Sequence, residues 1–314
     1  MNYVQMLYRQ KAVVILVLLT LYAIIFAPYF LTGHNLSNLF IQVSVYGIIA
    51  FAVTFVILNG QLDLSVGSVM AFSGIFMALL TEHMHVFLAV LFTILLGALI
   101  GLVIGLLVSY GNLHSFVVTL CAMFFFNGLA LKLSDARPIN VQDPFLNMVG
   151  NGKFFQIPVL VIIFFMTFVV GEYVLRKTKF GRNVYAVGGD EQVARFSGIS
   201  VRFYKIIVFV ISSAAAAFAG VLLAGMLNAA SPFVGGAAAL KVISCVVIGG
   251  TSLAGGEGGI RQTLIGVLIL GVLDNSLALM NVHSFYQTFI LGCLLVLVVG
   301  WDYYERSKKP ELAA

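Results

Sequence analysis

Residues 86–108 form the stretch VFLAVLFTILLGALIGLVIGLLV, which contains no charged side chain and is apolar on every face of a helix. A helix that crosses a bilayer needs about 20 such residues. A membrane-spanning β-strand would instead alternate apolar and polar residues over about ten positions. Because this stretch does not alternate, it predicts a transmembrane helix.

The whole chain has the composition of a membrane protein. Of its 314 residues, 61% are hydrophobic and 9% are charged, whereas soluble domains carry about 25% charged residues. Ten helices of about 20 residues would use roughly 200 residues, close to the apolar share of the chain. The composition therefore excludes a water-soluble fold and predicts an all-α polytopic membrane protein.

Hydropathy divides the chain into about ten transmembrane helices within one transmembrane domain, residues 1–314. The first is expected to be a retained helix, because no small-x-small cleavage site follows it. The ten predicted spans are 12–30, 38–58, 64–81, 86–109, 114–132, 157–175, 206–226, 237–250, 262–280 and 284–302.

Charge predicts the orientation of these spans. The loop 176–205 holds seven Lys and Arg against two acidic residues, which places it in the cytoplasm. An even number of spans then places both termini in the cytoplasm, and the connection 133–156 on the opposite side. This bias and anionic lipid explain the net charge of +5, so no nucleic-acid partner is indicated. Basic and aromatic residues near the two ends agree: Arg9, Lys11, Arg306, Lys308 and Lys309, with Trp301, Tyr303 and Tyr304.

The sequence offers no metal or disulfide pattern. Cys121, Cys245 and Cys293 lie inside apolar stretches, with no CxxC motif and no His at ligand spacing. Neither HExxH nor DxxxD occurs, so an intramembrane enzyme is not indicated.

The segment NGQLDLSVGS, residues 59–68, places polar side chains and two glycines between apolar helices. Polar groups at such a junction need water or protein partners. One interpretation is a helix break that lines a solute pathway and offers hydrogen bonds from Asn59, Gln61 and Asp63. The other is an interfacial turn in which Asp63 or Ser65 caps the next helix.

A second segment, IGGTSLAGGEGGI at residues 248–260, contains six glycines. It lacks the Lys of a phosphate-binding loop, so it is either a tight turn or a structured contact near the pathway or a cytoplasmic partner. Its glycines include Gly249, Gly250, Gly255 and Gly256. The spacing of Gly60, Leu64 and Gly67 recurs within it, and this echo indicates either a parallel internal repeat or chance.

The basic loop contains DEQVARFSGI, residues 190–199. Asp190 is expected to cap a short helix, Val193 and Phe196 share one face, and Gly198 ends it. The sequence therefore predicts a short amphipathic docking helix, although the basic residues around it are also what any cytoplasmic loop of a membrane protein carries.

Several polar residues lie inside predicted spans, where ionisable groups are costly and usually face the protein interior or a water-filled path. Asp274 is the most informative, because its own span has no basic residue. Asn127 and Asn275 either line the pathway or make hydrogen bonds between helices, and Gly97, Gly101 and Gly105 predict close helix packing. The group comprises Gln42, Asn127, Lys241, Asp274 and Asn275.

Four motifs, in order, resemble the permease subunits of bacterial ATP-binding-cassette importers for sugars, of the ribose and galactose permease type. They are LDLSVGS at 62–68, TKFGR at 178–182, AVGGDE with SGI at 186–199, and VIGGTSL with its following glycines at 247–258. The resemblance covers almost the whole chain. Three departures stand out: Lys241 lies where the family has an acidic stretch, Gln61 replaces a glycine, and Asp190 replaces an asparagine.

The resemblance implies a multi-pass importer subunit of the bacterial inner membrane. In such importers a periplasmic or lipid-anchored binding protein delivers a sugar, and two permease chains, identical or homologous, form the pathway. Two ATPase subunits bind the ATP and drive alternating access, so the chain itself needs no cofactor and is not an enzyme. The expected pathway residues are Asn59, Gln61, Asp63, Ser65, Asn127, Asp274 and Asn275. The expected ATPase-docking residues are Gly181, Arg182, Asp190, Glu191, Ala194, Ser197 and Gly198.

A different class of transporter is the main alternative. In an ion-coupled secondary transporter of a small polar solute, Asp63 and Asp274 would be the coupling carboxylates.

Overall fold

The computed structural model describes residues 11–307, without the side chains of 295, 298, 299 and 301–307. The predicted basic and aromatic side chains at 9, 301, 303, 304, 306, 308 and 309 lie outside this described part. The elements in chain order are α2 (Lys11–Phe26), α3 (Gly33–Leu58), α4 (Val66–Thr81), α5 (Val86–Ser109), α6 (Ser115–Leu133), β1 (Ile139–Asn140), α7 (Pro144–Asn151), β2 (Lys153–Phe154), β3 (Ile157–Pro158), α8 (Val159–Lys177), α9 (Lys179–Gly189), α10 (Glu191–Phe196), α11 (Val201–Leu227), β4 (Ala229–Ala230), α12 (Ala238–Gly249), α13 (Ile260–Leu279) and α14 (Ser284–Ser307).

The predicted all-helical class is confirmed. Six of the described helices are long and apolar enough to cross a membrane, namely α3, α5, α6, α8, α11 and α13. Four shorter apolar helical segments, α2, α4, α12 and the first part of α14, occupy the other four predicted spans. The number of ten spans therefore stays a prediction, because length and composition support six.

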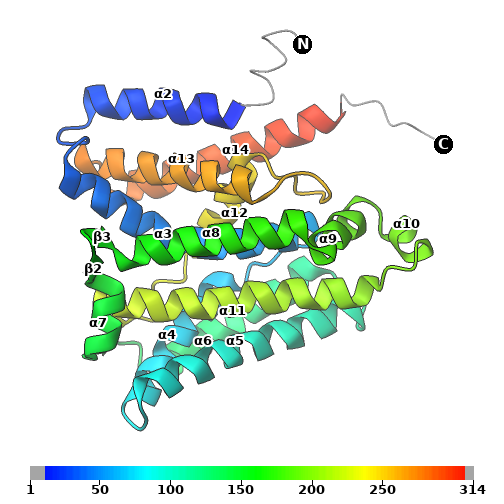
Figure 1. Ribbon diagram of the computed structural model, residues 1–314, viewed down its shortest axis with the longest axis horizontal. Helices are drawn as coiled ribbons and strands as arrows, with labels where there is room; N and C mark the ends of the chain where they lie inside the picture. The colour runs from blue at the N-terminus through cyan, green and yellow to red at the C-terminus, as the bar shows by residue number, and fades with distance from the viewer. Residues whose placement is uncertain (1–10, 308–314) are drawn as a thin grey trace.

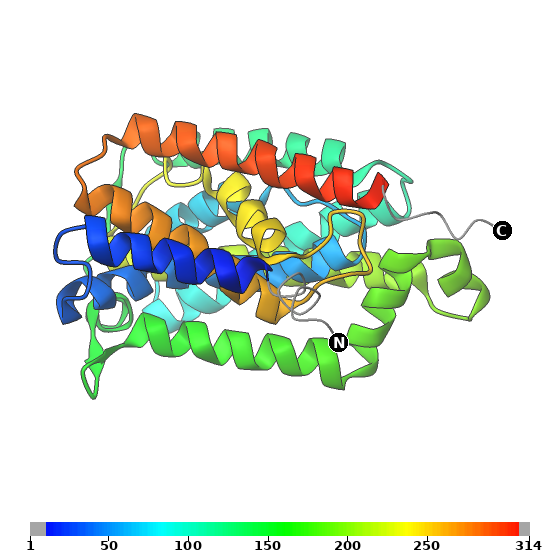
Figure 2. The same ribbon diagram turned by 90° about the horizontal axis from the view of Figure 1, so that it is seen from above.

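Most helices run along the long axis of the molecule, and the small elements lie at its two ends (Figure 1). One end carries α9 and α10, and the other carries α7 and the β2–β3 pair. Helices α8 and α14 lie on opposite flanks (Figure 2). The beginning of α2 and the end of α14 both point toward the α9–α10 end, as a common side for the two termini requires (Figure 1).

Helix α3 is the central element of the core. Every residue from Val43 to Leu58 is buried except Tyr46, and the helix contacts α8, α11, α12 and α13. Aromatic rings fill one side of it, where Phe51 stacks on Phe164 of α8 with 5.2 Å between ring centroids. A helix buried on all sides in this way is apolar all round, which explains why its hydropathy shows no polar stripe.

Two of the shorter apolar helices, α4 and α12, each follow a break in the chain. Helix α12 has 12 residues and is about 18 Å long, whereas the hydrocarbon core is about 30 Å thick. Helix α4 has 16 residues. Each follows a long helix and a non-helical segment, residues 59–65 before α4 and residues 228–237 before α12. Helices α4 and α12 lie within the predicted spans 64–81 and 237–250, and we call these two short helices, each preceded by a break, the half-helices.

The two long–short pairs run in opposite directions. Helix α3 begins near β3 and ends against α9, while α11 begins against α9 and α10 and ends beside α7 and β4. The unit α3–break–α4 and the unit α11–break–α12 therefore have opposite orientations in the bundle. This pairing of helices differs from the predicted parallel repeat of residues 60–67 at residues 249–256. Residues 60–67 lead into α4, whereas residues 249–256 follow α12.

The predicted glycine stripe on α5 packs against α11, which confirms its structural role. A Cβ on Gly97 would meet Ser213 O at 2.8 Å, and one on Gly105 would meet Ile206 Cα at 2.7 Å. These glycines let the two backbones touch, as small residues do in membrane helix pairs.

Replacing Gly101 by Ala is expected to destabilise the protein by about 2 kcal/mol, because overpacking a close contact forces backbone shifts. The new Cβ would lie 2.7 Å from Val210 Cα. Unfolding by denaturing detergent measures the change. Gly128→Ala is the matched control, since its Cβ would meet nothing within 4 Å. Equal stability of the two variants would contradict the packing role of the stripe.

Candidate translocation site

The break between α3 and α4 exposes backbone groups inside the protein, and neighbouring helices supply their partners. Leu62 N donates to Ser115 Oγ at 3.2 Å, and Thr119 Oγ1 donates to Leu62 O at 3.4 Å. Both hydroxyls come from the first turns of α6. Non-helical backbone at membrane depth persists only where such partners exist. Gly60 begins the break with a φ of +73°, which glycine adopts at little cost.

Asp63 fixes the break to both α4 and α11. Its Oδ1 accepts from Ser65 N at 3.0 Å and from Ser65 Oγ at 2.6 Å. Its Oδ2 accepts from Ser212 Oγ of α11 at 2.7 Å. The carboxyl group is completely buried. The structure therefore favours a turn in which Asp63 is a buried structural acid over a group exposed to solute, and the predicted Ser65 side-chain cap of α4 is absent.

The other polar residues of this segment differ from Asp63. Asn59 ends α3 and is 2% exposed, and neither its Oδ1 nor its Nδ2 has a hydrogen-bond partner. A buried amide without partners is costly, so Asn59 has unused hydrogen-bonding capacity. Gln61 is half-buried and Ser65 is buried.

The two half-helices begin against one another. A Cβ on Gly67 in α4 would overlap Gly235 O, and a Cβ on Gly235 would overlap Gly67 O. Ala238, the first residue of α12, lies 3.2 Å from the same hypothetical Cβ of Gly67. Both N-terminal ends, each with partial positive charge from the helix dipole, therefore meet in the interior. Broken helices of this kind surround substrate sites in many transporters.

An ion pair lies beside this meeting point. Lys241 Nζ of α12 is 2.5 Å from Asp274 Oδ2 of α13, and each side chain is 26% exposed. The ammonium group also lies 4.5 Å from the centre of the Tyr46 ring of α3. Gln42 and Cys245 complete a cavity of about 20 Å³, room for one water molecule. The basic partner that the span of Asp274 lacks thus comes from the half-helix α12.

The asparagines of the predicted site lie in different places. Asn275 exchanges two hydrogen bonds of 2.9 Å with Asn35 of α3, which is the interhelical bond weighed as its alternative role. Asn127 is exposed on α6. The structure therefore does not bring Asn127, Asp274 and Asn275 together with residues 59–65 in one cluster.

The glycine-rich segment 249–259 is a folded loop that makes specific contacts. Gly256 N donates to Leu58 O at the end of α3 at 3.0 Å. Gly188 of α9 lies against the same carbonyl, and a Cβ on Gly255 would lie 2.8 Å from Gly60 N. These four glycines, Gly60, Gly188, Gly255 and Gly256, form what we call the glycine junction. The segment is therefore a turn that also contacts α3 and α9, and its place near a pathway or a partner stays a prediction.

A tyrosine strengthens the link between the loop and α9. Tyr185 Oη donates to Gly258 O at 2.7 Å. Burial raises the pKa of Tyr185, so its phenol stays protonated and able to donate. Gly250 and Gly258 have φ values of +106° and +128°, a region that side chains other than glycine rarely adopt. The glycine content of the loop is thus a backbone requirement.

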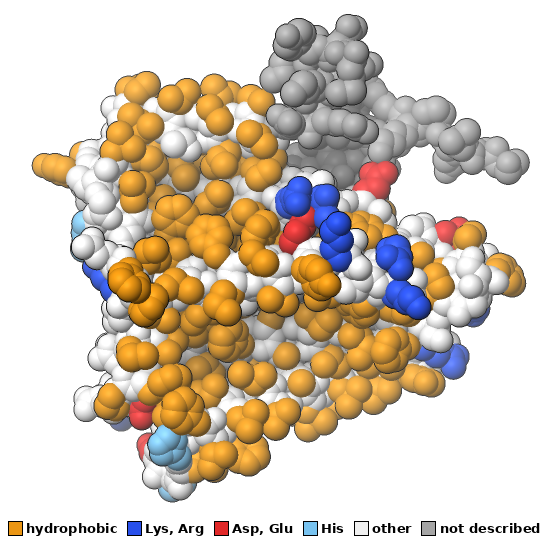
Figure 3. Space-filling view, viewed as in Figure 1, with side chains coloured by type: hydrophobic (Ala, Val, Ile, Leu, Met, Phe, Trp, Pro, Cys, Tyr) orange, Lys and Arg blue, Asp and Glu red, His pale blue; other side chains and the backbone are white. Residues whose placement is uncertain are grey.

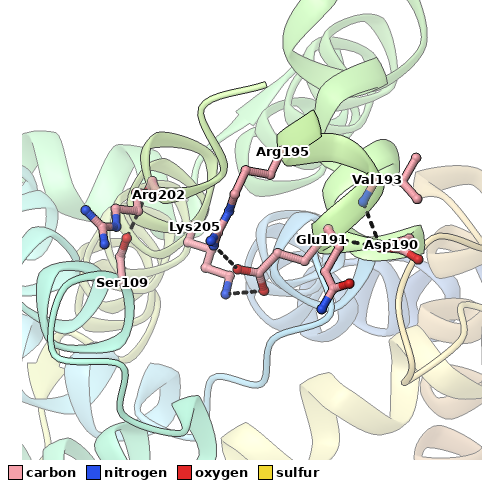
Figure 4. Close-up of polar contacts among 8 residues, drawn as sticks. Ser109, Asp190, Glu191, Val193, Arg195, Arg202 and Lys205 are labelled. Carbon is pink, nitrogen blue, oxygen red and sulfur yellow. Dashed lines mark hydrogen bonds and ion pairs between the residues drawn. The ribbon is translucent and has the colours of Figure 1, made fainter. Parts of the chain in front are cut away.

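The predicted docking helix is present as α10, at one end of the molecule (Figures 1 and 4). Asp190 caps it as expected, because its Oδ1 accepts from Gln192 N at 2.8 Å and from Val193 N at 2.9 Å. Gly198 follows with a φ of +80°. The expected N-cap and helix stop are confirmed.

Two contacts anchor α10 and leave one face free. Glu191 Oε2 pairs with Lys205 Nζ of α11 at 2.7 Å (Figure 4). Ala194 is buried in a small apolar cluster with Val187 and Val201. On the free face, 60% of Val193 and 89% of Phe196 are exposed. The apolar face of α10 is therefore not covered by the rest of the described chain.

The remaining residues predicted to dock the ATPase lie in two places, at the start of α9 and at the end of α10. Gly181 packs against Leu175 O at the turn from α8 to α9. Ser197 Oγ donates to Val193 O at 2.9 Å, and Arg182 is exposed on α9.

Sequence analysis missed several residues that complete these sites: Asn35, Tyr46, Ser212, Ser115 and Thr119. Each is a polar or aromatic residue whose partner lies 50 or more residues away or on another helix. The sequence shows most of them only as polar side chains within apolar stretches, and that pattern does not identify the residue with which each one pairs.

Comparison with known proteins decides the family. The model of the family described as branched-chain amino acid transport system / permease component matches residues 35–299. The chain belongs to this permease family. No solved structure matches.

Curated relatives of this permease cover nearly all of its length. It is 42% identical to the ribose import permease protein RbsC of Bacillus subtilis over 91% of this chain and 90% of the relative. It is 36% identical to RbsC of Haemophilus influenzae over 96% and 95% of the two chains. It is 37% identical to the L-arabinose ABC transporter permease protein AraH of Azospirillum brasilense over 94% and 88%. The predicted resemblance to sugar-importer permeases and the multi-pass inner-membrane location are confirmed.

Replacing Lys241 by Met is expected to cost about 2 kcal/mol of stability, since removal of one partner leaves the other charge poorly compensated. The double variant Lys241→Met with Asp274→Asn is expected to recover most of this loss. Denaturing-detergent titration of the three proteins measures the coupling. Additive losses in the double variant would contradict a direct ion pair.

Proposed function

We propose that this permease is the membrane-spanning subunit of an ATP-binding-cassette importer that moves a sugar into the cytoplasm by ATP-driven alternating access. Its proposed partners are two ATPase subunits that bind the ATP, a periplasmic or lipid-anchored sugar-binding protein, and a second permease chain, identical or homologous. The chain itself then contributes the pathway and needs no cofactor. The end that carries α9 and α10 is the cytoplasmic end in this proposal.

The observation that carries the proposal is the exposed face of α10. Val193 and Phe196 project from a helix that is capped by Asp190 and tied to α11 through Glu191 and Lys205. A helix of six residues gains little stability from its own hydrogen bonds. These anchors hold it in place while its apolar face remains uncovered, which suits a pocket on an ATPase.

The glycine junction supplies a route from α10 to the half-helices. Gly188 precedes α10 by three residues and touches Leu58 O, where α3 ends before the break that leads to α4. The same carbonyl accepts from Gly256 N in the loop that follows α12. Movement of α10 would therefore act together on the break before α4 and on the loop that follows α12. In the proposed cycle, closure of the ATPases rocks α4 and α12 about these contacts and opens the pathway alternately to each side.

An ion-coupled secondary transporter is less well supported. Such a mechanism needs a carboxylate that exchanges an ion with solvent. Asp63 is buried and all its contacts are with Ser65 and Ser212. Asp274 is paired with Lys241.

For the substrate we propose a pentose. The relatives are named for ribose and L-arabinose, which are both five-carbon sugars, whereas the family description mentions branched-chain amino acids. Asn59, whose buried amide has no hydrogen-bond partner, offers hydrogen bonds of the kind that hydroxyl groups need.

The double variant Val193→Ser with Phe196→Ser is expected to lower ATPase association and ATP-dependent uptake at least tenfold. Removing an exposed aromatic anchor costs an interface more than about 1.4 kcal/mol, which is a factor of ten. Copurification of the ATPase and uptake into proteoliposomes measure the two effects. Thermal stability of the permease should not change, because both side chains are exposed.

Leu113→Ser is the matched control, because it removes an exposed apolar side chain from the loop between α5 and α6 at the same end of the molecule. Its uptake and ATPase association should stay within about twofold of the unchanged protein. Uptake that survives loss of the ATPase but collapses with the proton gradient would overturn the proposal in favour of secondary transport.

Competition identifies the substrate class. Uptake of labelled ribose or L-arabinose by the complete system should be inhibited at least tenfold more strongly by an unlabelled pentose than by glucose or leucine, because a missing or extra hydroxyl leaves polar groups unpaired. Preferential inhibition by leucine would point instead to the substrate in the family description.

A further inference from the structure

A basic hollow lies where α8 ends and where α9 and α13 begin. It is open to solvent, has a volume of about 510 Å³, and lies outside the contacts between half-helices. Its wall contains two apolar or aromatic side chains and four basic ones: Leu175, Tyr185, Arg176, Lys177, Arg182 and Arg261.

One acidic side chain, Glu172, pairs with two of these basic side chains but does not neutralise the positive charge of the hollow. Glu172, 13% exposed, lies 2.6 Å from Arg176 Nε and 2.7 Å from Arg261 Nε. The two arginine side chains remain 50% and 62% exposed. Four positive charges against the one negative charge of Glu172 leave the group at +3. Lys177 and Arg182 form no ion pair with an acidic side chain in the described part of the chain.

The hollow continues an apolar surface of α8. Met166, Val169, Val170 and Tyr173 are exposed and recur at i, i+3, i+4 and i+7, so they share one face of the helix. Arg176 and Lys177 follow at three and four residues after Tyr173 and therefore extend the same face. Figure 3 shows the blue basic side chains gathered at one end of this surface, beside an orange apolar area. An apolar surface followed by positive charge suits the acyl chains and the headgroup of an anionic phospholipid that lies along the helix.

We propose that Arg176, Lys177, Arg182 and Arg261 bind the phosphate headgroup of an anionic phospholipid, whose acyl chains lie against the exposed face of α8. Guanidinium groups bind phosphate oxygens through several donors at once. Basic pockets between transmembrane helices on the cytoplasmic side are suited to such headgroups. A free phosphate ion would use the cations alone, whereas the lipid uses both the cations and the adjoining apolar face.

The test uses the purified full-length permease in detergent, with phosphatidylglycerol and phosphatidylcholine as probes and native mass spectrometry as the readout. We expect phosphatidylglycerol to bind at least tenfold more tightly than phosphatidylcholine. The variant Lys177→Gln with Arg182→Gln should weaken phosphatidylglycerol binding about tenfold, because each basic residue near an anionic lipid contributes to its affinity. Neither change leaves Glu172 unpaired, so the fold should be retained.

The matched control is Lys179→Gln with Arg202→Gln, which removes the same charge from exposed residues outside the hollow. It should bind phosphatidylglycerol within about twofold of the unchanged permease. Equal losses in the two variants would overturn the proposal, because net charge alone would then explain binding. A second outcome would also overturn the proposal. If millimolar inorganic phosphate displaced the lipid and the permease bound the two lipids equally well, the ligand would be a phosphate ion and not a phospholipid. Because no ATPase is present, these outcomes are independent of the proposed transport function.

Discussion

The fold depends on satisfying polar backbone groups where two helices break inside an apolar protein. An unpaired amide or carbonyl costs several kcal/mol in such surroundings. At the first break, α6 supplies Ser115 and Thr119, and Asp63 links the start of α4 to Ser212 of α11. The surrounding helices are thus arranged as much by these few hydrogen bonds as by apolar contact, because lipid competes for the apolar faces.

The close approach of helix backbones is the second feature that holds the structure together, and glycine residues allow it in three places. It brings α5 onto α11, it brings the first turns of α4 and α12 together, and it forms the glycine junction beside α9. Without hydrophobic driving force between helices in lipid, dispersion contacts at short range and hydrogen bonds must hold the bundle. The 31 glycines of the chain are therefore concentrated in contacts as well as in turns.

Sequence analysis predicted what depends on local pattern. Hydropathy located the apolar helices, the spacing of Gly97, Gly101 and Gly105 indicated a packed face, and Asp190 to Gly198 indicated a capped short helix. It located α12 to within one residue at each end, but it did not predict that the first turns of α4 and α12 meet, because hydropathy does not record which helices are neighbours. Nor did it pair Lys241 with Asp274 or Asn35 with Asn275. Those partners lie 33 and 240 residues apart, and their distance in space depends on the whole bundle.

The glycine junction constrains the length of the chain around α10. Gly188 and Glu191 are separated by two residues, so no slack lies between the contact with Leu58 O and the first turn of α10. One residue inserted into α9 would turn everything beyond it by about 100° and shift it by about 1.5 Å. Phe196 would then point to a different side of the molecule. Homologous chains should therefore vary in side chains on this segment while keeping its residue count, because an insertion there changes direction and not merely composition.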